Sequence, residues 1–292
     1  MIYEQQAREM RVLVCCCDEE AATRIANVLD DCHIERVSDK ESLLAAVVAT
    51  PADLVVTGQG TSGAEAVAIL RNIRSIRPDT RVILQPKRST REDVVAAIRD
   101  GAFSYFSRPY FEAAFGEILR HAVSGAPWED SIAVNSATPM WLRMFARCEL
   151  TTADRVTQFM NELSDLDGKE RESMGFALKE ILMNAMEYGG KFDRERFVEI
   201  SYVRGQRMIL YRVRDPGEGF SLDELPHAAI SNPPEEPVRH LEVRDSKGMR
   251  PGGYGVLLSR KLVDDLIYSE QGNDVLLIKY LDLPTSETAE SD

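Results

Sequence analysis

The stretch KERESMGFALKEILMNAMEYGG, residues 169–190, is the most informative part of the second half of the chain. Apolar residues at helical spacing form one stripe along it, made of Met174, Leu178, Ile181 and Ala185. Such a stripe predicts an amphipathic helix over 169–188, and the glycine pair at 189–190 is typical of a helix end. The polar residues beside the stripe therefore decide what this helix can do.

Glu180 and Asn184 are four residues apart, which places both side chains on one face of the predicted helix, at the edge of the stripe. At a phosphate site an amide oxygen can ligate Mg²⁺, and a carboxylate can orient or deprotonate an attacking hydroxyl. This spacing is common in helices, so by itself it does not identify a catalytic site.

Two glycine-rich turns follow. Residues 198–203 and 207–213 predict a hairpin that leads into Asp215-Pro-Gly-Glu-Gly219. The glycines permit close approach of a ligand, and a buried carboxylate accepts a hydrogen bond from an exocyclic amine; a plain hairpin-to-helix turn is the alternative. A long stretch without periodicity then ends at GGYG, residues 252–255. The helix predicted next, over 256–265, would turn its free amides toward a phosphate.

In this order, with a final strand at 275–280, these features resemble the ATP-binding domain of the GHKL superfamily over residues 138–283. The segments ALKEILMNAMEYGG, VRDPGEGF and GGYGVLLSRKLVDDLIY are most similar to anti-sigma-factor serine kinases. The resemblance implies an α+β two-layer sandwich that binds ATP and Mg²⁺. It also implies that Glu180 is the general base, that Asn184 holds Mg²⁺ and that Asp215 contacts the adenine amine.

The same resemblance assigns the remaining pocket residues. Gly217 and Gly219 would shape the adenine pocket, while Gly253 and Gly255 would face the phosphates. The threonine that the family often carries on the final strand is absent here, and Asn273 stands near its place with a carboxamide that could substitute for it.

The first half of the chain alternates short apolar runs with helical patterns. Strands are predicted at 11–16, 33–37, 54–57, 81–84 and 104–106. Helices are predicted at 19–30, 40–50, 63–76, 90–100 and 111–122. We expect Asp18, Asp39 and Ser89 to cap helices. Five such repeats predict a flavodoxin-like, doubly wound parallel sheet covered by helices on both faces.

This half resembles a response-regulator receiver domain in the segments RVLVCCCDEE, ADLVVTG and GAFSYFSRP. The family's acidic pair falls on Cys16 and Cys17, its phosphorylated aspartate on Gly58, its switch residue on Pro86 and its lysine on Arg108. A thiol is a poor ligand for a hard cation, and glycine has no side chain to phosphorylate. We therefore expect a receiver-like domain without aspartyl phosphorylation.

The five cysteines are an odd number, and Cys15, Cys16 and Cys17 are consecutive in an apolar run. This pattern is not a disulfide framework. Because neighbouring residues of a strand point to opposite faces, these sulfurs are not expected to converge on one metal. Buried packing is the interpretation that the sequence favours.

Composition sets the broad class. The net charge of −13 and the pI near 4.9 disfavour a protein that coats nucleic acid or anionic lipid. No apolar run approaches the roughly 18 residues of a membrane span, which favours a cytoplasmic protein. We expect a receiver-like domain at 1–125, a linker at 126–137, the ATPase domain at 138–284 and a disordered tail at 285–292.

The leading hypothesis is an ATP- and Mg²⁺-dependent protein serine/threonine kinase of the anti-sigma-factor type. The resemblance implies a small STAS-type antagonist protein as substrate, a sigma factor as a second partner, a homodimer, and no direct nucleic acid or membrane partner. A non-catalytic ATP-binding signalling adaptor and an atypical histidine kinase are the alternatives. The stretch 124–138 has neither a histidine nor room for a dimerising hairpin, which disfavours the histidine kinase.

Overall fold

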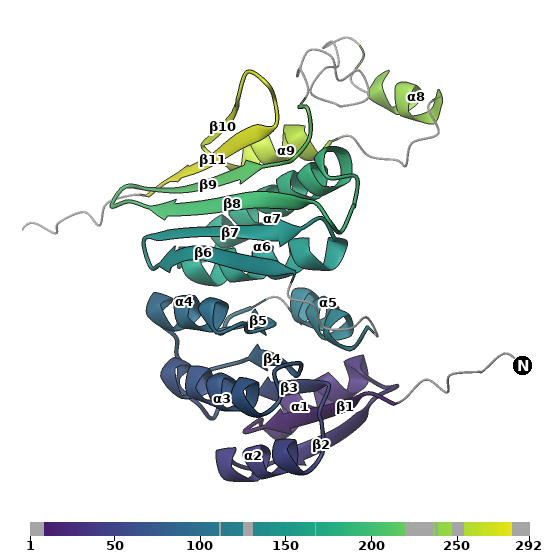
Figure 1. Cartoon of the computed structure of the whole chain (residues 1–292). Helices are drawn as coiled ribbons and strands as arrows, with labels where there is room; N and C mark the ends of the chain where they lie inside the picture. The colour runs from purple at the N-terminus through teal and green to yellow at the C-terminus, as the bar shows by residue number, and fades with distance from the viewer. Residues whose placement is uncertain are drawn as a thin grey trace, which may run out of the picture. The chain divides into compact units, whose positions relative to one another are not determined.

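A computed structural model describes residues 9–110, 112–124, 131–166, 168–219, 236, 239–246 and 254–281. The chain divides into two compact units, residues 1–130 and 131–292. A parallel sheet forms the centre of the first unit, and an antiparallel sheet forms one layer of the second (Figure 1).

The sheet of the first unit has the strand order β2-β1-β3-β4-β5. Its strands are β1 (Arg11–Cys15), β2 (His33–Val37), β3 (Leu54–Thr57), β4 (Arg81–Leu84) and β5 (Ser104–Tyr105). All the pairings are parallel, and β3 and β4 are buried along their whole length, as strands covered on both faces must be. This order defines the flavodoxin-like doubly wound fold, which confirms the predicted fold class.

Five helices connect these strands: α1 (Glu19–Val28), α2 (Lys40–Ala49), α3 (Gly63–Ile76), α4 (Arg91–Arg99) and α5 (Glu112–Val123). The carboxylates of Asp18 and Asp39 accept hydrogen bonds from backbone N–H groups of α1 and α2, so both predicted caps are confirmed. The predicted cap at Ser89 is wrong. Thr90 caps α4: its hydroxyl oxygen accepts a hydrogen bond from the Asp93 N–H, and the Asp93 carboxylate accepts one from the Thr90 N–H, which completes a capping box.

The carboxyl edge of this sheet has no room for an aspartate where receivers are phosphorylated. A Cβ atom on Gly58 would lie closer than 3.0 Å to the peptide that joins Cys16 and Cys17. The Gly58 N–H also donates to the Cys15 carbonyl at 2.6 Å. The loop after β1 therefore fills the space that an acidic side chain would need.

The sheet of the second unit has the order β10-β11-β9-β8-β7-β6 and is antiparallel throughout. Its strands are β6 (Ile132–Thr138), β7 (Trp141–Arg147), β8 (Phe197–Arg204), β9 (Met208–Arg214), β10 (Asp265–Tyr268) and β11 (Asp274–Tyr280). Burial alternates along β7, β8 and β9, so one face of the sheet is buried and the other is open.

The helices of this unit are α6 (Leu150–Ser164), α7 (Gly168–Asn184), η1 (Ala185–Gly189), α8 (Arg239–Ser246) and α9 (Gly255–Leu262). Helix α7 packs between α6 and α9 against the buried face of the sheet (Figure 1). The hydroxyl groups of Tyr202 and Tyr211 donate to carbonyls of α6 at 3.1 and 3.2 Å, so the sheet and this helix share satisfied polar contacts inside an apolar core. The result is the predicted α+β two-layer sandwich of the GHKL type.

Three elements differ from the sequence prediction. Strand β6 pairs with β7 inside the stretch expected as a linker, so the second unit begins at Ser131. The sequence predicted helix to residue 265, but strand β10 follows α9 within four residues. The strand was missed because its short run Asp265–Tyr268 has no clear period of its own. Helix α8 lies in the stretch predicted to lack regular structure.

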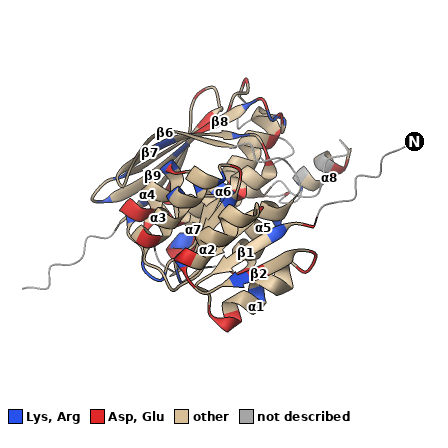
Figure 2. Ribbon diagram, turned by 60° about the horizontal axis from the view of Figure 1, so that its bottom comes forward, with Lys and Arg blue, Asp and Glu red and all other residues tan. Residues whose placement is uncertain are grey.

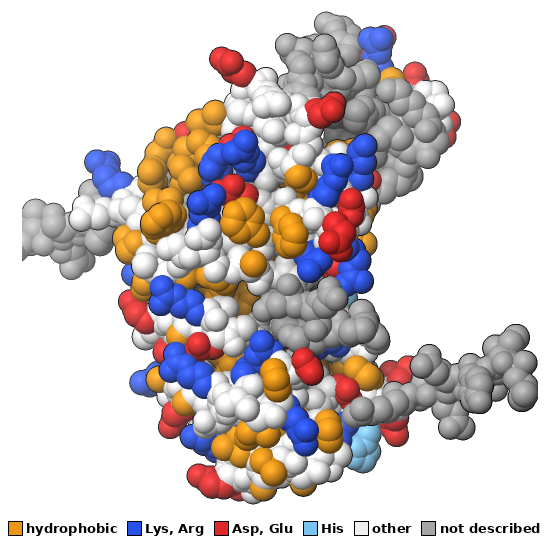
Figure 3. All heavy atoms as spheres, in the orientation of Figure 1, with side chains coloured by type: hydrophobic (Ala, Val, Ile, Leu, Met, Phe, Trp, Pro, Cys, Tyr) orange, Lys and Arg blue, Asp and Glu red, His pale blue; other side chains and the backbone are white. Residues whose placement is uncertain are grey.

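The open face of the second sheet faces the viewer in Figure 1, where the strands lie in front of α6 and α7. Hydrophobic and basic side chains share it in Figure 3. Arg143 and Arg147 lie over the rings of Phe145 and Phe197 at 5.5 and 5.2 Å, so cations cover part of the apolar surface. Figure 2 shows acidic and basic residues spread over the elements of each unit rather than gathered on one of them.

Candidate functional site

Helix α7 brings the two predicted polar residues to one place. Glu180 and Asn184 lie one turn apart and are both partly buried, while the predicted apolar stripe beside them is buried. Directly after Asn184 the helix widens into the π-helical turn η1, where the sequence predicted continuous α-helix. Isolated π-turns of this kind occur frequently at functional sites.

Asp215 lies just beyond the end of β9, next to the end of η1. Its Oδ1 atom accepts a hydrogen bond from the Gly217 N–H at 2.7 Å, and its own N–H donates to the Asn273 carbonyl at 3.0 Å. A Cβ atom on Gly189 would lie closer than 3.0 Å to that Oδ1 atom. The glycine that ends η1 is thus needed for the carboxylate to take this position.

Gly217 and Gly219, the two glycines after Asp215, are required for different structural reasons. A Cβ atom on Gly217 would meet both Asp215 Oδ1 and the Gly189 Cα atom at 2.8 Å, so this position requires close backbone approach. Gly219 has a φ of 87°, and a Cβ atom there would lie closer than 3.0 Å to the Gln271 carbonyl oxygen. Backbone conformation and space both exclude a side chain at Gly219.

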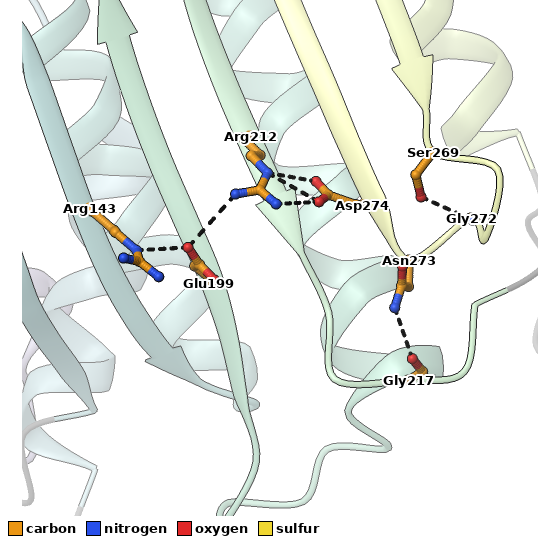
Figure 4. A network of polar contacts seen from close by, with 8 residues as sticks. All are labelled: Arg143, Glu199, Arg212, Gly217, Ser269, Gly272, Asn273 and Asp274. Atoms are coloured by element: carbon orange, nitrogen blue, oxygen red, sulfur yellow. Dashed lines mark hydrogen bonds and ion pairs between the residues drawn. The ribbon is translucent and has the colours of Figure 1, made fainter.

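Asn273 fastens this loop to the turn between β10 and β11. Its Nδ2 atom donates to the Gly217 carbonyl at 3.1 Å (Figure 4). Its backbone carbonyl accepts from Asp215, so side chain and backbone hold the same loop. The sequence placed Asn273 near the adenine pocket, and the structure places it where its amide nitrogen sets the shape of the Asp215–Gly219 turn.

A polar network on the open face supports the strand pair that carries these residues. Arg143 donates to Glu199 at 2.7 Å, and the Arg212 Nε atom donates to Asp274 at 2.9 Å (Figure 4). Arg212 also lies 3.9 Å from Glu199, so the contacts cross β7, β8, β9 and β11. Asp274 directly follows Asn273, and the network therefore stabilises the register of β9 and β11 beside the site.

The Asp215 side chain is partly buried. Burial raises the pKa of the Asp215 carboxyl above its ordinary value, and the Gly217 N–H opposes this shift. Burial together with the charge of Asp215 also raises the pKa of the Tyr268 phenol. Burial raises the pKa of the Cys148 thiol to about 11, and the charges of Asp193 and Asp215 add to this effect. A partly desolvated carboxylate favours directed hydrogen bonding to a bound group.

Sequence reasoning did not identify Gly189, Tyr268 or Cys148 as neighbours of Asp215. The glycine pair at 189–190 was interpreted only as a helix end. A Cβ atom on Gly190 would lie closer than 3.0 Å to the Cys148 sulfur, so both glycines are close-packed. Tyr268 reaches this region because β10 pairs with β11, a strand pair that the sequence did not predict.

The other end of the site lies where α9 meets α7. Gly255 is the first residue of α9, and a Cβ atom on it would lie closer than 3.0 Å to the Glu180 Oε2 atom. Ser259 of α9 is buried and donates to the Ala177 carbonyl at 3.5 Å. Glu180 thus lies beside a helix N-terminus, the kind of position that attracts phosphate groups. Gly253 lies outside the described residues.

These residues fit a nucleotide with its Mg²⁺ ion. The Asp215 carboxylate can accept a hydrogen bond from an amine, and the glycines around it allow the close backbone packing that holds it in place. The Asn184 side-chain oxygen is a ligand of the kind that Mg²⁺ prefers. The N-terminus of α9, which lies beside Glu180, can supply backbone N–H groups to the phosphates.

Comparison with known proteins agrees with this geometry. A family described as "Histidine kinase-like ATPase domain" matches residues 146–279. This part of the chain is similar to histidine kinase-like ATPase domains. Its range contains every site residue that the sequence predicted in the second unit. The domain indicates an ATP-binding signalling protein with kinase or ATPase activity in general. No curated protein matches the chain.

Solved structures similar to the chain include receiver domains. One from Clostridium thermocellum is 21% identical, covers 39% of this chain and 94% of its own, and has a TM-score of 0.33. A response regulator from Thermotoga maritima is 19% identical, with 40% and 99% covered and a TM-score of 0.35. A receiver domain of an HD domain-containing protein from Pseudomonas fluorescens is 21% identical, with 40% and 95% covered and a TM-score of 0.36.

Among the described residues, no helix combines the length and the apolar character that crossing a membrane requires.

Proposed function

We propose that the protein is an ATP- and Mg²⁺-dependent protein serine/threonine kinase of the anti-sigma-factor type, which acts in bacterial partner switching. Its substrate is a small STAS-type antagonist protein, a sigma factor is its second partner, and it works as a homodimer in the cytoplasm. The receiver-like unit serves as an input or docking domain without aspartyl phosphorylation.

One observation carries the proposal. The helix formed by α7 and η1 meets Gly255 of α9 at Glu180 and meets Asp215 at Gly189. The carboxylate suited to a phosphate-transfer step therefore lies on this helix, and the acceptor suited to an adenine amine lies against the end of the same helix. Asn184 lies between these two contacts, in the last turn of α7.

The residues divide the chemistry between them. Asp215 accepts a hydrogen bond from the adenine amine, while Gly217, Gly219 and Asn273 keep its loop in shape. Asn184 supplies an oxygen ligand for the metal ion. When bound, ATP and Mg²⁺ supply the γ-phosphoryl group and the positive charge that neutralises the phosphates.

Glu180 orients the serine hydroxyl of the protein substrate and accepts its proton on a carboxylate oxygen. Gly255 turns its backbone N–H toward the phosphates at the start of α9, and the same role expected for Gly253 lies outside the described residues. The missing side chain at Gly255 leaves room for the Glu180 carboxylate at this position.

Transfer of labelled phosphate from ATP to a STAS-type antagonist of the same organism tests the proposal, with ATP affinity measured in parallel. We expect Glu180→Gln to lower the transfer rate by roughly 10²- to 10⁴-fold while ATP affinity stays within a few fold, because general base catalysis contributes about that much. Glu172→Gln is the matched control: it lies on the same helix, is exposed, and should leave both quantities unchanged.

The other outcomes separate the alternatives. Phosphate that appears on histidine would favour an atypical histidine kinase. Tight ATP binding without transfer to any protein, unchanged by Glu180→Gln, would favour a non-catalytic adaptor. Either result contradicts the proposed serine kinase.

A further inference from the structure

The sulfur atoms of Cys15 and Cys16 lie 3.1 Å apart at the end of β1. The alternation expected for a strand does not reach Cys16, because β1 ends at Cys15 and Cys16 has a φ of 56°. This left-handed residue turns its side chain back toward the face that Cys15 occupies. The premise that neighbouring residues here point to opposite faces therefore fails for Cys15 and Cys16.

The backbone around the pair is held firmly. The Cys16 N–H donates to the Val37 carbonyl at 3.2 Å, and the carbonyls of Cys15 and Cys16 accept from Gly58 and Gly60 at 2.6 and 3.2 Å. Since Gly58 has no room for a Cβ atom, the loop has little freedom to move away from it. The short distance between the two sulfurs is thus built into the fold.

Both sulfurs face the start of α2, whereas the third cysteine faces the opposite layer. Cys15 Sγ lies 3.6 Å from the Asp39 carbonyl, and Cys16 Sγ lies 3.5 Å from the Ser38 carbonyl. Cys17 packs against the core cluster that contains residues of α1 and α5. Among the described residues, no group of three or more His, Cys, Asp or Glu side chains is placed to hold a metal ion. The chemistry of the pair is that of two thiols.

The two thiols differ in access. Cys15 is fully buried, and burial followed by its contact with Cys16 raises the pKa of its thiol. Cys16 is partly exposed, so an oxidant in solution can reach its sulfur first. Oxidation follows exposure and thiolate character, and a sensor cysteine commonly has a resolving partner beside it.

We propose that Cys15 and Cys16 form a peroxide-sensitive dithiol that closes into a reversible disulfide between neighbouring residues. The Cys16 sulfur attacks the terminal oxygen of a peroxide ROOH, which becomes the alcohol ROH, and Cys16 becomes a sulfenic acid. The Cys15 sulfur then attacks the Cys16 sulfur, the S–S bond forms, and the sulfenic oxygen leaves as water with the Cys15 proton. In total, two thiols and one peroxide give one disulfide, one alcohol and one water.

The disulfide should be easy to reduce. Consecutive Cα atoms are about 3.8 Å apart, whereas most disulfides join Cα atoms separated by about 4.4 to 6.8 Å. Such a bond is strained, and strained disulfides are the labile ones. Reduction by an ordinary dithiol should therefore restore the pair.

Peptide mapping of the full-length protein tests this proposal without any use of kinase activity. The protein is treated with hydrogen peroxide, free thiols are alkylated, and the peptide with all three cysteines is examined by mass spectrometry. The Cys17→Ser variant removes ambiguity about which sulfurs pair. We expect its peptide to lose two hydrogen masses and to resist alkylation at both cysteines, with full reversal by dithiothreitol.

The Cys15→Ser variant should instead accumulate a sulfenic acid on Cys16 that dimedone traps. Alkylation of both cysteines after peroxide treatment would overturn the proposal. So would pairing in the wild-type protein that involves Cys17, Cys32 or a second chain in place of the Cys15–Cys16 bond. Mapping of the wild type decides the question even if one variant fails to fold.

Discussion

The Asp215 carboxylate is partly buried in the glycine turn around it, and this burial lowers the stability of the folded protein when no ligand is bound. Because the pKa of Asp215 is raised in the folded protein, the folded state binds this proton more tightly than the unfolded state. Its contribution to stability therefore falls as the pH rises through the range between the two pKa values. At neutral pH the ionised carboxylate destabilises the free protein.

Asp215→Asn should raise the melting temperature of the ligand-free protein at pH 7, since it removes this charge and retains an acceptor for the Gly217 N–H. The gain should shrink as the pH falls and vanish below about pH 4, where aspartate carboxyls become neutral. ATP affinity should fall by about tenfold, because a neutral acceptor bonds the adenine amine less strongly.

Thermal unfolding across this pH range and calorimetric titration with ATP measure the two effects of Asp215→Asn. Asp165→Asn is a suitable control, because Asp165 is exposed and asparagine tolerates its left-handed backbone. Equal melting temperatures for wild type and Asp215→Asn at pH 7, together with unchanged affinity, would contradict the role given to Asp215.

Gly219→Ala should destabilise the second unit by about 1 to 3 kcal/mol or more, since it combines a strained backbone with a steric clash. The clash is with the Gln271 carbonyl, which belongs to backbone and cannot move aside cheaply. Gly205→Ala in the β8–β9 turn should change stability by less than about 0.5 kcal/mol, because a Cβ atom there meets only ordinary contacts. Denaturant unfolding compares the two variants, and equal stabilities would rule out the strain at Gly219.

At the scale of elements, the capping box of α4 provides a test in the first unit. Thr90→Ala should lower the free energy of unfolding by roughly 0.5 to 2 kcal/mol, because the N-terminal N–H groups of α4 lose their acceptor. Thr23→Ala on the exposed surface of α1 should be neutral or slightly stabilising, since alanine favours helix and the hydroxyl only bonds the Glu19 carbonyl. Denaturant unfolding that showed equal effects would contradict the assignment of Thr90 as the cap.

The elements also show what sequence patterns can and cannot predict. Helix α7 and strands β8 and β9 were predicted within a few residues, because each has one buried and one open face that leaves a period in the sequence. Strand β10 was missed, since its four residues are too few to show a period and it depends on pairing with β11. Strand β6 was missed because turn-like residues at 135–139 hide it.

The candidate site follows the same division. Glu180, Asn184 and Asp215 were predicted as site residues because their motifs, taken in order along the chain, resemble those of a known family, whereas the spacing of Glu180 and Asn184 alone is common in helices. Gly189, Cys148 and Tyr268 could not be predicted in this way, since their importance comes from contacts between segments far apart in sequence. The π-turn η1 has no known signature in the residues that form it, yet it sets where Gly189 meets Asp215.

At the scale of the whole molecule, the boundary between the two units has a direct consequence for truncated chains. A chain of residues 131–292 keeps strand β6, which pairs with β7 and contains the buried residue Ile132. A chain that begins at residue 138 loses this strand and exposes the edge of β7. We expect the longer chain to be monodisperse and cooperatively folded and the shorter one to aggregate, because an unpaired apolar edge recruits other strands.

Size-exclusion chromatography and thermal unfolding of both truncated chains check this expectation. The 131–292 chain should also bind ATP as the full chain does, since every described site residue lies in the second unit. Equal behaviour of the two truncated chains would show that β6 is dispensable and that the domain begins later than the structure indicates.

The central claim is that this unit holds ATP together with Mg²⁺ through Asn184, and calorimetric titration of the full-length protein tests it most directly. Wild type should bind ATP with an affinity that depends on Mg²⁺. Asn184→Ala should weaken that binding by at least roughly 10- to 100-fold, which is the usual effect of losing a residue that supports a metal ligand. Asn184→Asp keeps an oxygen ligand and should retain the dependence on Mg²⁺. No binding by the wild type, or identical Mg²⁺-dependent binding by Asn184→Ala, would contradict the account.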